Sequence, residues 1–233
     1  MGFNINFTGN TSKLISRYEE PIKLDTHKDW QICLTSFVVY NSINNVTEKN
    51  NKLYFIDDAG HYHDVVIPPG TYEVAEILDL INMHENAKKA GFTGVANLST
   101  RKIKILSTKM KVDFSRPNSL GRLLGFSKRI IGKNESAYSD IMVDIFPVNS
   151  ICVRCNLIEC NYENGKSRGN IIYSFPLNTP TGEKIVQIPA QHRYYPLNTY
   201  EIREALVQIV DQDNQLIDFE GEKISLELYV KPL

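Results

Sequence analysis

The sequence lacks the motifs that mark common enzymes and the apolar length that marks a membrane span. Neither GxxxxGK[ST] nor GxGxxG occurs, and no serine lies in a GxSxG elbow. A membrane-spanning helix needs about 18 or more apolar residues in a row, and no such run is present, so we expect no membrane span. The opening residues, MGFNINFTGN, have no basic segment followed by an apolar one, so we expect no secretory signal.

An excess of charge of one sign is also missing. The chain has 26 Lys and Arg against 27 Asp and Glu, a net charge of −1, and the two signs are interspersed. A protein that covers nucleic acid usually presents a broad basic face, so we expect no direct sequence-specific nucleic-acid binding. The 42% hydrophobic content is ordinary for a globular protein, and 233 residues suffice for one large or two small domains.

Cysteine is scarce, at four residues: Cys33, Cys152, Cys155 and Cys160. Without a secretory signal we expect reduced thiols that line the core. Cys152 and Cys155 form a CxxC, but in a strand residues three apart point to opposite faces. No second CxxC or paired histidine follows at zinc spacing. We therefore expect one core and one surface position, and no metal.

His61 and His63 place two imidazoles on one face of a predicted strand, and Asp57, Asp58 or Asp64 could add a third metal ligand. The HxH pair flanks a hairpin tip, where polar residues are expected anyway. We favour a surface hairpin over a metal site. The sequence thus predicts no catalytic, cofactor-binding or metal-binding residue, and we expect a protein that is not an enzyme and has no cofactor.

The longest apolar run is Trp30 to Val46, WQICLTSFVVYNSINNV, which contains no proline, glycine or charge. It predicts a buried strand that leaves the core at Asn41. Ser150 to Cys160 predicts a second core strand. Ile202 to Val210 fits either a helix or a strand by period, and the turn that follows favours a strand. Ile224 to Val230 alternates apolar and polar residues, as a half-buried strand does.

The best helix signal lies near residues 71–86. Thr71 is the expected N-cap, and Gly91 follows the helix. A shorter helix is expected at residues 119–125. The apolar residues of the first helix share one face, at Val74, Ile77, Leu78 and Ile81.

The order of these elements predicts a mainly β protein. Residues 1–49 and 132–233 would form a jelly-roll β-sandwich, and residues 50–131 an inserted small α/β module. Within the second β part, Ile141 to Phe146 is expected to be a strand and Asn164–Gly165 a turn.

Five segments, in this order and spacing, resemble the minor capsid, or penton, proteins of Polinton (Maverick) elements and the related adintoviruses. Each is a structural pattern and not a catalytic signature. The segments are LTSFVVYNSINNV (34–46), IPPGTYEVAEILDLIN (67–82), VDFSRPNSLGRLLGF (112–126), IIYSFPLNTPTGEKI (171–185) and IVDQDNQLIDFEGEKISLEL (209–228).

The resemblance implies a jelly-roll subunit, made in a host cell and located in the virion, that forms homopentamers at the fivefold vertices of an icosahedral capsid. It implies a double jelly-roll major capsid protein as the neighbour. A near-neutral chain is compatible with this role because five copies that meet do not repel strongly. The insert could contact a fibre or a host receptor.

Two other readings remain open from the residues. One is a jelly-roll binding module without a capsid role, lectin-like or a fibre head. The other is a cupin-like enzyme, but only the HxH pair is available for its metal. Interface positions are expected among aromatic residues near turns, Tyr194 and Tyr195 first. The same tyrosines could instead plug the end of the sandwich.

Overall fold

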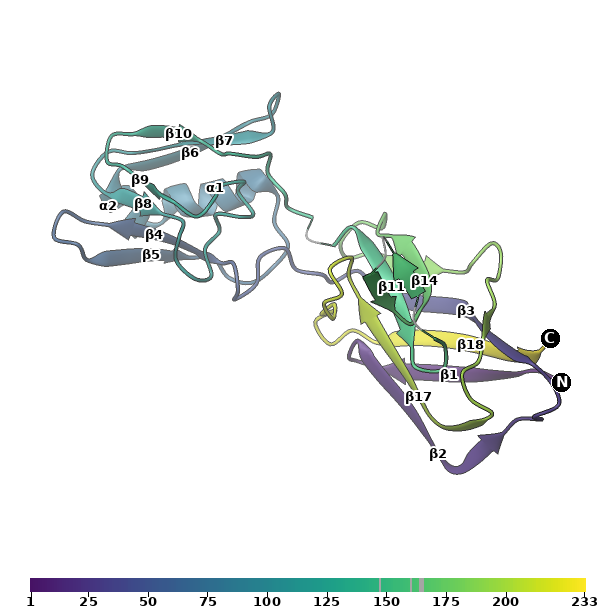
Figure 1. Cartoon of the computed structure of the whole chain (residues 1–233). Helices are drawn as coiled ribbons and strands as arrows, with labels where there is room; N and C mark the ends of the chain where they lie inside the picture. Colours follow the sequence, from purple (N-terminus) through teal and green to yellow (C-terminus); the bar gives the residue numbers. More distant parts are fainter. Residues whose placement is uncertain (147, 160, 164–165) are drawn as a thin grey trace. The chain divides into compact units, whose positions relative to one another are not determined.

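The structure is a computed structural model that describes residues 1–146, 148–159, 161–163 and 166–233. The chain forms two compact units with separate hydrophobic cores (Figure 1). Unit 1 comprises Met1–Ile43 and Val148–Leu233, and unit 2 comprises Asn44–Pro147. The boundaries expected at 49/50 and 131/132 differ from these, because the flanking residues hydrogen-bond within unit 2. Val46 N donates to Gly70 O, and Val143 N donates to Arg101 O.

Unit 1 is built of antiparallel strands. Cys160 and the turn expected at Asn164–Gly165 lie outside the described residues. The strands are β1 (Phe3–Gly9), β2 (Lys13–Lys23), β3 (Trp30–Tyr40), β11 (Ser150–Cys155), β12 (Asn161–Glu163), β13 (Lys166–Gly169), β14 (Ile171–Pro176), β15 (Lys184–Gln187), β16 (Tyr195–Pro196), β17 (Glu201–Val210) and β18 (Ile224–Pro232).

Two sheets of unit 1 form a jelly roll. One has the order β1-β18-β3-β15, with β16 also beside β3, and the other has the order β14-β11-β17-β2. Successive long strands along the chain therefore alternate between the two sheets, except that β11 and β14 are neighbours in the same sheet, as in a jelly roll. Unit 2 lies in the connection from β3 to β11. The expected jelly-roll fold is confirmed.

β3 is the central strand of its sheet, as its sequence predicts. Phe37 is fully buried, and its ring centroid lies 5.6 Å from that of Phe175 on the opposite sheet. The strand ends at Tyr40, and the Asn41 side chain then donates a hydrogen bond to Thr179 O at 2.7 Å. The apolar run thus ends at a polar side chain, because the backbone carbonyl of Thr179 in a neighbouring loop needs a hydrogen-bond donor.

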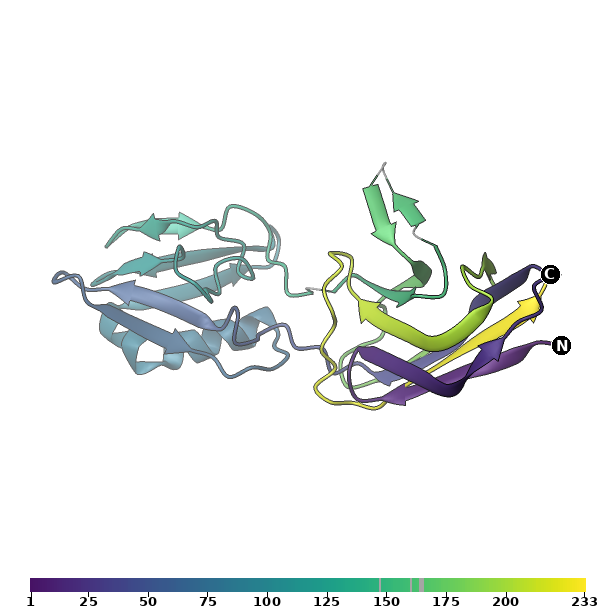
Figure 2. The same cartoon turned by 60° about the horizontal axis from the view of Figure 1, so that its bottom comes forward.

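Unit 2 contains two small sheets, with the orders β5-β4-β8-β9 and β10-β7-β6. Figure 2 shows its helices along one side of the strands. The elements are β4 (Lys52–Ile56), β5 (Tyr62–Val66), α1 (Val74–Met83), α2 (Glu85–Ala90), β6 (Phe92–Asn97), β7 (Lys102–Ser107), β8 (Lys111–Asp113), β9 (Ile130–Ile131) and β10 (Ser136–Tyr138).

The helix expected near 71–86 is present but begins later and is divided. Its N-cap is Glu73, which forms a capping box with Glu76, and not Thr71. Residues before the cap cannot turn helical because Tyr72 N donates to the Asn45 side chain. His84 adopts an extended conformation between α1 and α2, and Gly91 ends α2 in the left-handed conformation that glycine adopts easily.

Two other expectations are wrong. Residues 119–125 form successive turns and not a helix. Ile141 to Phe146 has no strand ladder, although it alternates. Val143 and Ile145 pack against the core of unit 2, while Met142 and Phe146 are exposed. The alternating pattern therefore arises because one side of an irregular segment is buried. Sequence periodicity alone cannot distinguish such a segment from a strand.

The three described cysteines are buried, and none of them is in a disulfide within the described residues. Cys155 belongs to the core of unit 1. One cysteine of the CxxC pair was expected at the surface, but Cys152, which lies outside that core, is also buried, at 2% exposed. Within the described residues, no helix is both long enough and apolar enough to cross a membrane.

Candidate functional site

Tyr194 and Tyr195 lie against the sheet of unit 1 that contains β3. Tyr195 opens β16 and pairs with Ile32. The Tyr194 hydroxyl donates a hydrogen bond to the Cys33 thiol, and Lys231 Nζ lies 4.0 Å from the centroid of the Tyr194 ring. Both tyrosines are half-buried. They therefore pack on their own subunit, and their interface role stays a prediction.

The Cys33 thiol and the Tyr194 hydroxyl are held in their neutral forms. Burial raises the pKa of the Cys33 thiol, against the opposing effect of the Tyr194 hydrogen bond. Desolvation also raises the pKa of Tyr194, and the neighbouring Cys33 raises that pKa further. Neither group is thus an activated nucleophile.

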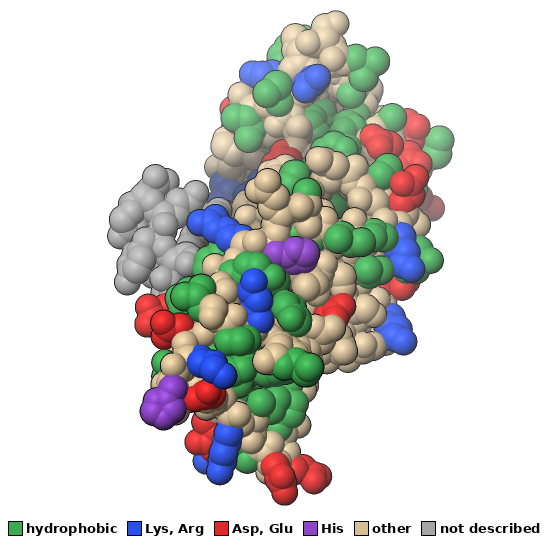
Figure 3. All heavy atoms as spheres, turned by 90° about the vertical axis from the view of Figure 1, so that its right-hand side faces the viewer, with side chains coloured by type: hydrophobic (Ala, Val, Ile, Leu, Met, Phe, Trp, Pro, Cys, Tyr) green, Lys and Arg blue, Asp and Glu red, His purple; other side chains and the backbone are tan. Residues whose placement is uncertain are grey.

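Figure 3, which views the end of unit 1 that carries the termini, shows hydrophobic side chains interspersed with both charges and no broad basic face.

His61 and His63 converge on one carboxylate oxygen at the tip of the β4–β5 hairpin. Asp57 Oδ2 lies 3.3 Å from His61 Nδ1 and 3.2 Å from His63 Nε2. The backbone N–H of His61 and the side chain of His63 lower the pKa of Asp57 to about 2. Among the described residues, no group of three His, Cys, Asp or Glu is placed to hold a metal. The carboxylate instead organises the turn, because it also accepts from Ala59 N.

A groove that the sequence did not indicate opens between β14 and β15. These strands are the edges of the two jelly-roll sheets, so among the described residues no further strand of either sheet lies between them. The cavity volume is about 260 Å³. Its lining residues are Tyr173, Ser174, Phe175, Pro176, Leu177, Asn178, Thr179, Ile185, Val186 and Gln187.

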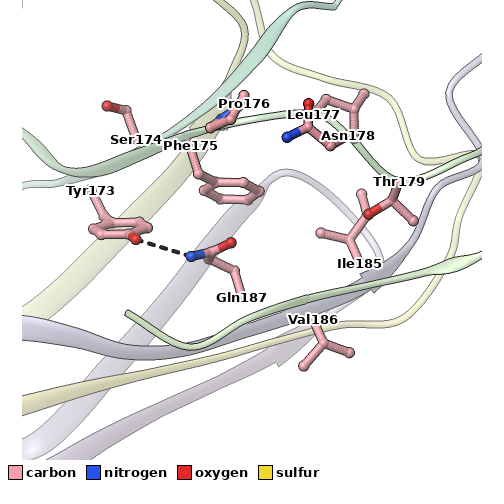
Figure 4. A pocket seen from close by; sticks show the side chains of 10 residues that line it. All are labelled: Tyr173, Ser174, Phe175, Pro176, Leu177, Asn178, Thr179, Ile185, Val186 and Gln187. Carbon is pink, nitrogen blue, oxygen red and sulfur yellow. Dashed lines mark hydrogen bonds between the residues drawn. The ribbon is translucent and has the colours of Figure 1, made fainter. Parts of the chain in front are cut away.

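A hydrogen bond across the two sheets spans this groove. Gln187 Nε2 donates to Tyr173 Oη at 3.0 Å. Figure 4 shows both side chains pointing toward one another beside the Phe175 ring, with Thr179 and Ile185 on the far side of that ring from Tyr173. Phe175 and Ile185 are buried and belong to the core of unit 1, so the groove ends on the core itself.

Sequence reasoning could not find the groove. Tyr173 and Gln187 lie on different strands of different sheets, and no motif connects them. The segment 171–185 carried part of the family resemblance, but only as a structural pattern. One signal was available, because 171–182 contains one amide and four hydroxyl side chains and no charge.

Comparison with solved structures gives a full-length match. The crystal structure of the selenomethionine-labelled mavirus penton protein aligns with a TM-score of 0.54, covering 100% of both chains at 12% identity. The chain has the fold of that penton protein. A chain of the Sputnik virophage cryo-EM structure aligns with a TM-score of 0.44 at 12% identity, covering 98% of this chain and 97% of that one. No family model and no curated protein matches the sequence.

Proposed function

We propose that this protein is a minor capsid, or penton, subunit of a virion, forming homopentamers at the fivefold vertices of an icosahedral capsid. The observation that carries the proposal is the full-length match to the mavirus penton protein, which covers both units of this chain. A match to unit 1 alone would have indicated only a common sandwich. Fold alone does not fix function, so the match supports the proposal without replacing its test.

The composition and the sites described above agree with a structural role. Net charge is −1, so five copies can meet without strong repulsion. The Cys33 thiol and Tyr194 are held neutral, and the His61–Asp57–His63 contacts order a turn. These groups serve folding, which agrees with a protein that is not an enzyme.

A closed ring needs two different surfaces on each copy, because fivefold contacts are head-to-tail. Electron microscopy of the purified full chain tests for such a ring. We expect class averages with fivefold symmetry, alone or after mixing with a double jelly-roll major capsid protein. Monomers or trimers under both conditions would contradict the proposal and would favour a jelly-roll binding module without a capsid role.

Unit 2 is proposed as the part that meets a fibre or a host receptor. Its own core, which includes Phe55, Ile77 and Ile81, makes it a separate folded body on one connection of the jelly roll. Connections of this kind carry function more often than the scaffold does. Binding of isolated virions to host cells, with and without competing purified unit 2, tests this role. Undiminished attachment would contradict it.

A further inference from the structure

We propose that the groove between β14 and β15 binds a neutral saccharide. The inference goes beyond the proposed capsid role and does not depend on it. It rests on three observations: the groove is a half-open hollow of about 260 Å³, its lining carries no charged side chain, and polar side chains on its rim, those of Ser174, Asn178 and Gln187, have hydrogen-bonding groups that are not used among the described residues.

The size of the cavity suits a small ligand. At about 260 Å³ it lies just below the range of drug-sized ligand pockets, which run from roughly 300 to 1,000 Å³. One or two sugar rings are ligands of that size. The floor is apolar, since Phe175 and Ile185 are buried in the core of unit 1. A sugar ring can place its C–H face on such a floor.

The polar rim matches hydroxyl groups. Gln187 uses its Nε2 on Tyr173, which leaves its Oε1 as an acceptor without a partner among the described residues, and the Tyr173 O–H as a donor. Asn178 and Ser174 are exposed and have no side-chain hydrogen bond within the described chain. Amides and hydroxyls both donate and accept, as each sugar hydroxyl does.

The lining selects against charged ligands. An acidic sugar or a phosphate would need a cation beside it, because an unpaired charge loses solvation on binding. The nearest lysine in sequence, Lys184, instead has its Nζ 5.7 Å from the centroid of the Tyr40 ring. The chemistry therefore favours a neutral ligand with one apolar face.

Saturation-transfer NMR on the full chain tests this site. The probes are N-acetyllactosamine, chitotriose and maltotriose, with sialyllactose as the acidic comparison, each at millimolar concentration. We expect transfer to at least one neutral probe. Absence of transfer to all three, or a signal from sialyllactose alone, would overturn the proposal.

Matched variants place the binding in the groove. Gln187→Ala and Asn178→Ala should each weaken binding by about tenfold, since each removes hydrogen bonds to the ligand. Gln191→Ala, which removes an exposed amide outside the groove, should leave it unchanged. Because Asn178 is exposed, its replacement is not expected to unfold the protein. Unchanged binding in both groove variants would overturn the assignment.

A measurement of the mass of the assembled protein, made on the same variants, distinguishes a saccharide site in the groove from a contact between subunits there. If the groove instead receives a neighbouring subunit, Gln187→Ala and Asn178→Ala will reduce assembly, and no saccharide will bind to the assembled protein. That result would overturn the saccharide site while leaving the pentamer proposal intact.

Discussion

At the scale of single residues, the jelly roll depends on aromatic side chains that join its two sheets. Phe37 from β3 is fully buried and contacts the Phe175 ring from β14. Phe37→Ala should lower the free energy of unfolding by about 3–5 kcal/mol, because it deletes a large side chain from a close-packed core. Urea unfolding of the full chain measures this.

The control for that change is Val186→Ala on β15, where the side chain is 56% exposed. We expect its free energy of unfolding to stay within about 0.5 kcal/mol of the unmodified chain. Similar losses in the two variants would mean that Phe37 does not lie in the core.

The thiols offer a second residue-scale prediction. Cys33, Cys152 and Cys155 are buried, and burial raises the pKa of the Cys155 thiol to about 11. Thiolate is the reactive form, so these three cysteines should not react with Ellman's reagent in the folded protein at neutral pH. At most one thiol, that of Cys160, should react before unfolding, and all four should react in concentrated urea. Rapid reaction of two or more in the folded state would contradict this.

Asp57 gives a pH-dependent prediction. Its pKa is lowered from 3.8 to about 2, first by the backbone N–H of His61 and then by the His63 side chain. A lowered carboxyl pKa stabilises the folded state above the unfolded value, and that contribution is lost as the pH falls from about 3.8 through about 2. Carboxyl NMR should show Asp57 titrating near 2. A midpoint near 3.8 would show that the histidine contacts are absent.

At the scale of elements, strands with long apolar runs could be predicted from the sequence. Element ends that depend on contacts with residues distant in sequence could not. β3 could be predicted because a central strand needs an apolar run such as 30–40, although Thr35 and Val38 are only partly buried and Tyr40 is exposed. The start of α1 could not, because Asn45, distant in sequence, holds Tyr72 in place. The groove between β14 and β15 was also invisible, since it exists only once the edges of two sheets face each other.

The separate cores of the two units give an element-scale prediction. Replacing residues 44–147 by a short glycine–serine linker should leave unit 1 folded, because no residue of its core lies in the deleted segment. Circular dichroism and a cooperative thermal transition measure folding. An unfolded product would show that unit 1 needs the insert.

The same deletion tests where the subunit contacts lie. If the jelly roll carries them, the deleted protein should still form pentamers, and its binding to host cells should be lost. A folded but monomeric product would place part of the ring contact in unit 2 and would contradict its role as an appendage.

At the scale of the whole molecule, one chain forms a jelly roll with an insert, and we propose that five copies form a closed ring. The fold follows from the strand order and from the full-length match to the mavirus penton protein. The ring is the proposed part. A cyclic assembly closes at a fixed number of subunits, so its mass is a whole multiple of the subunit mass. The number of subunits therefore follows directly from a measured mass.

Native mass spectrometry of the purified full chain is the most direct test. We predict a dominant species of five times the 26.6 kDa mass of one chain, in solution or on addition of the double jelly-roll major capsid protein. A dominant monomer or trimer under both conditions would contradict the penton account.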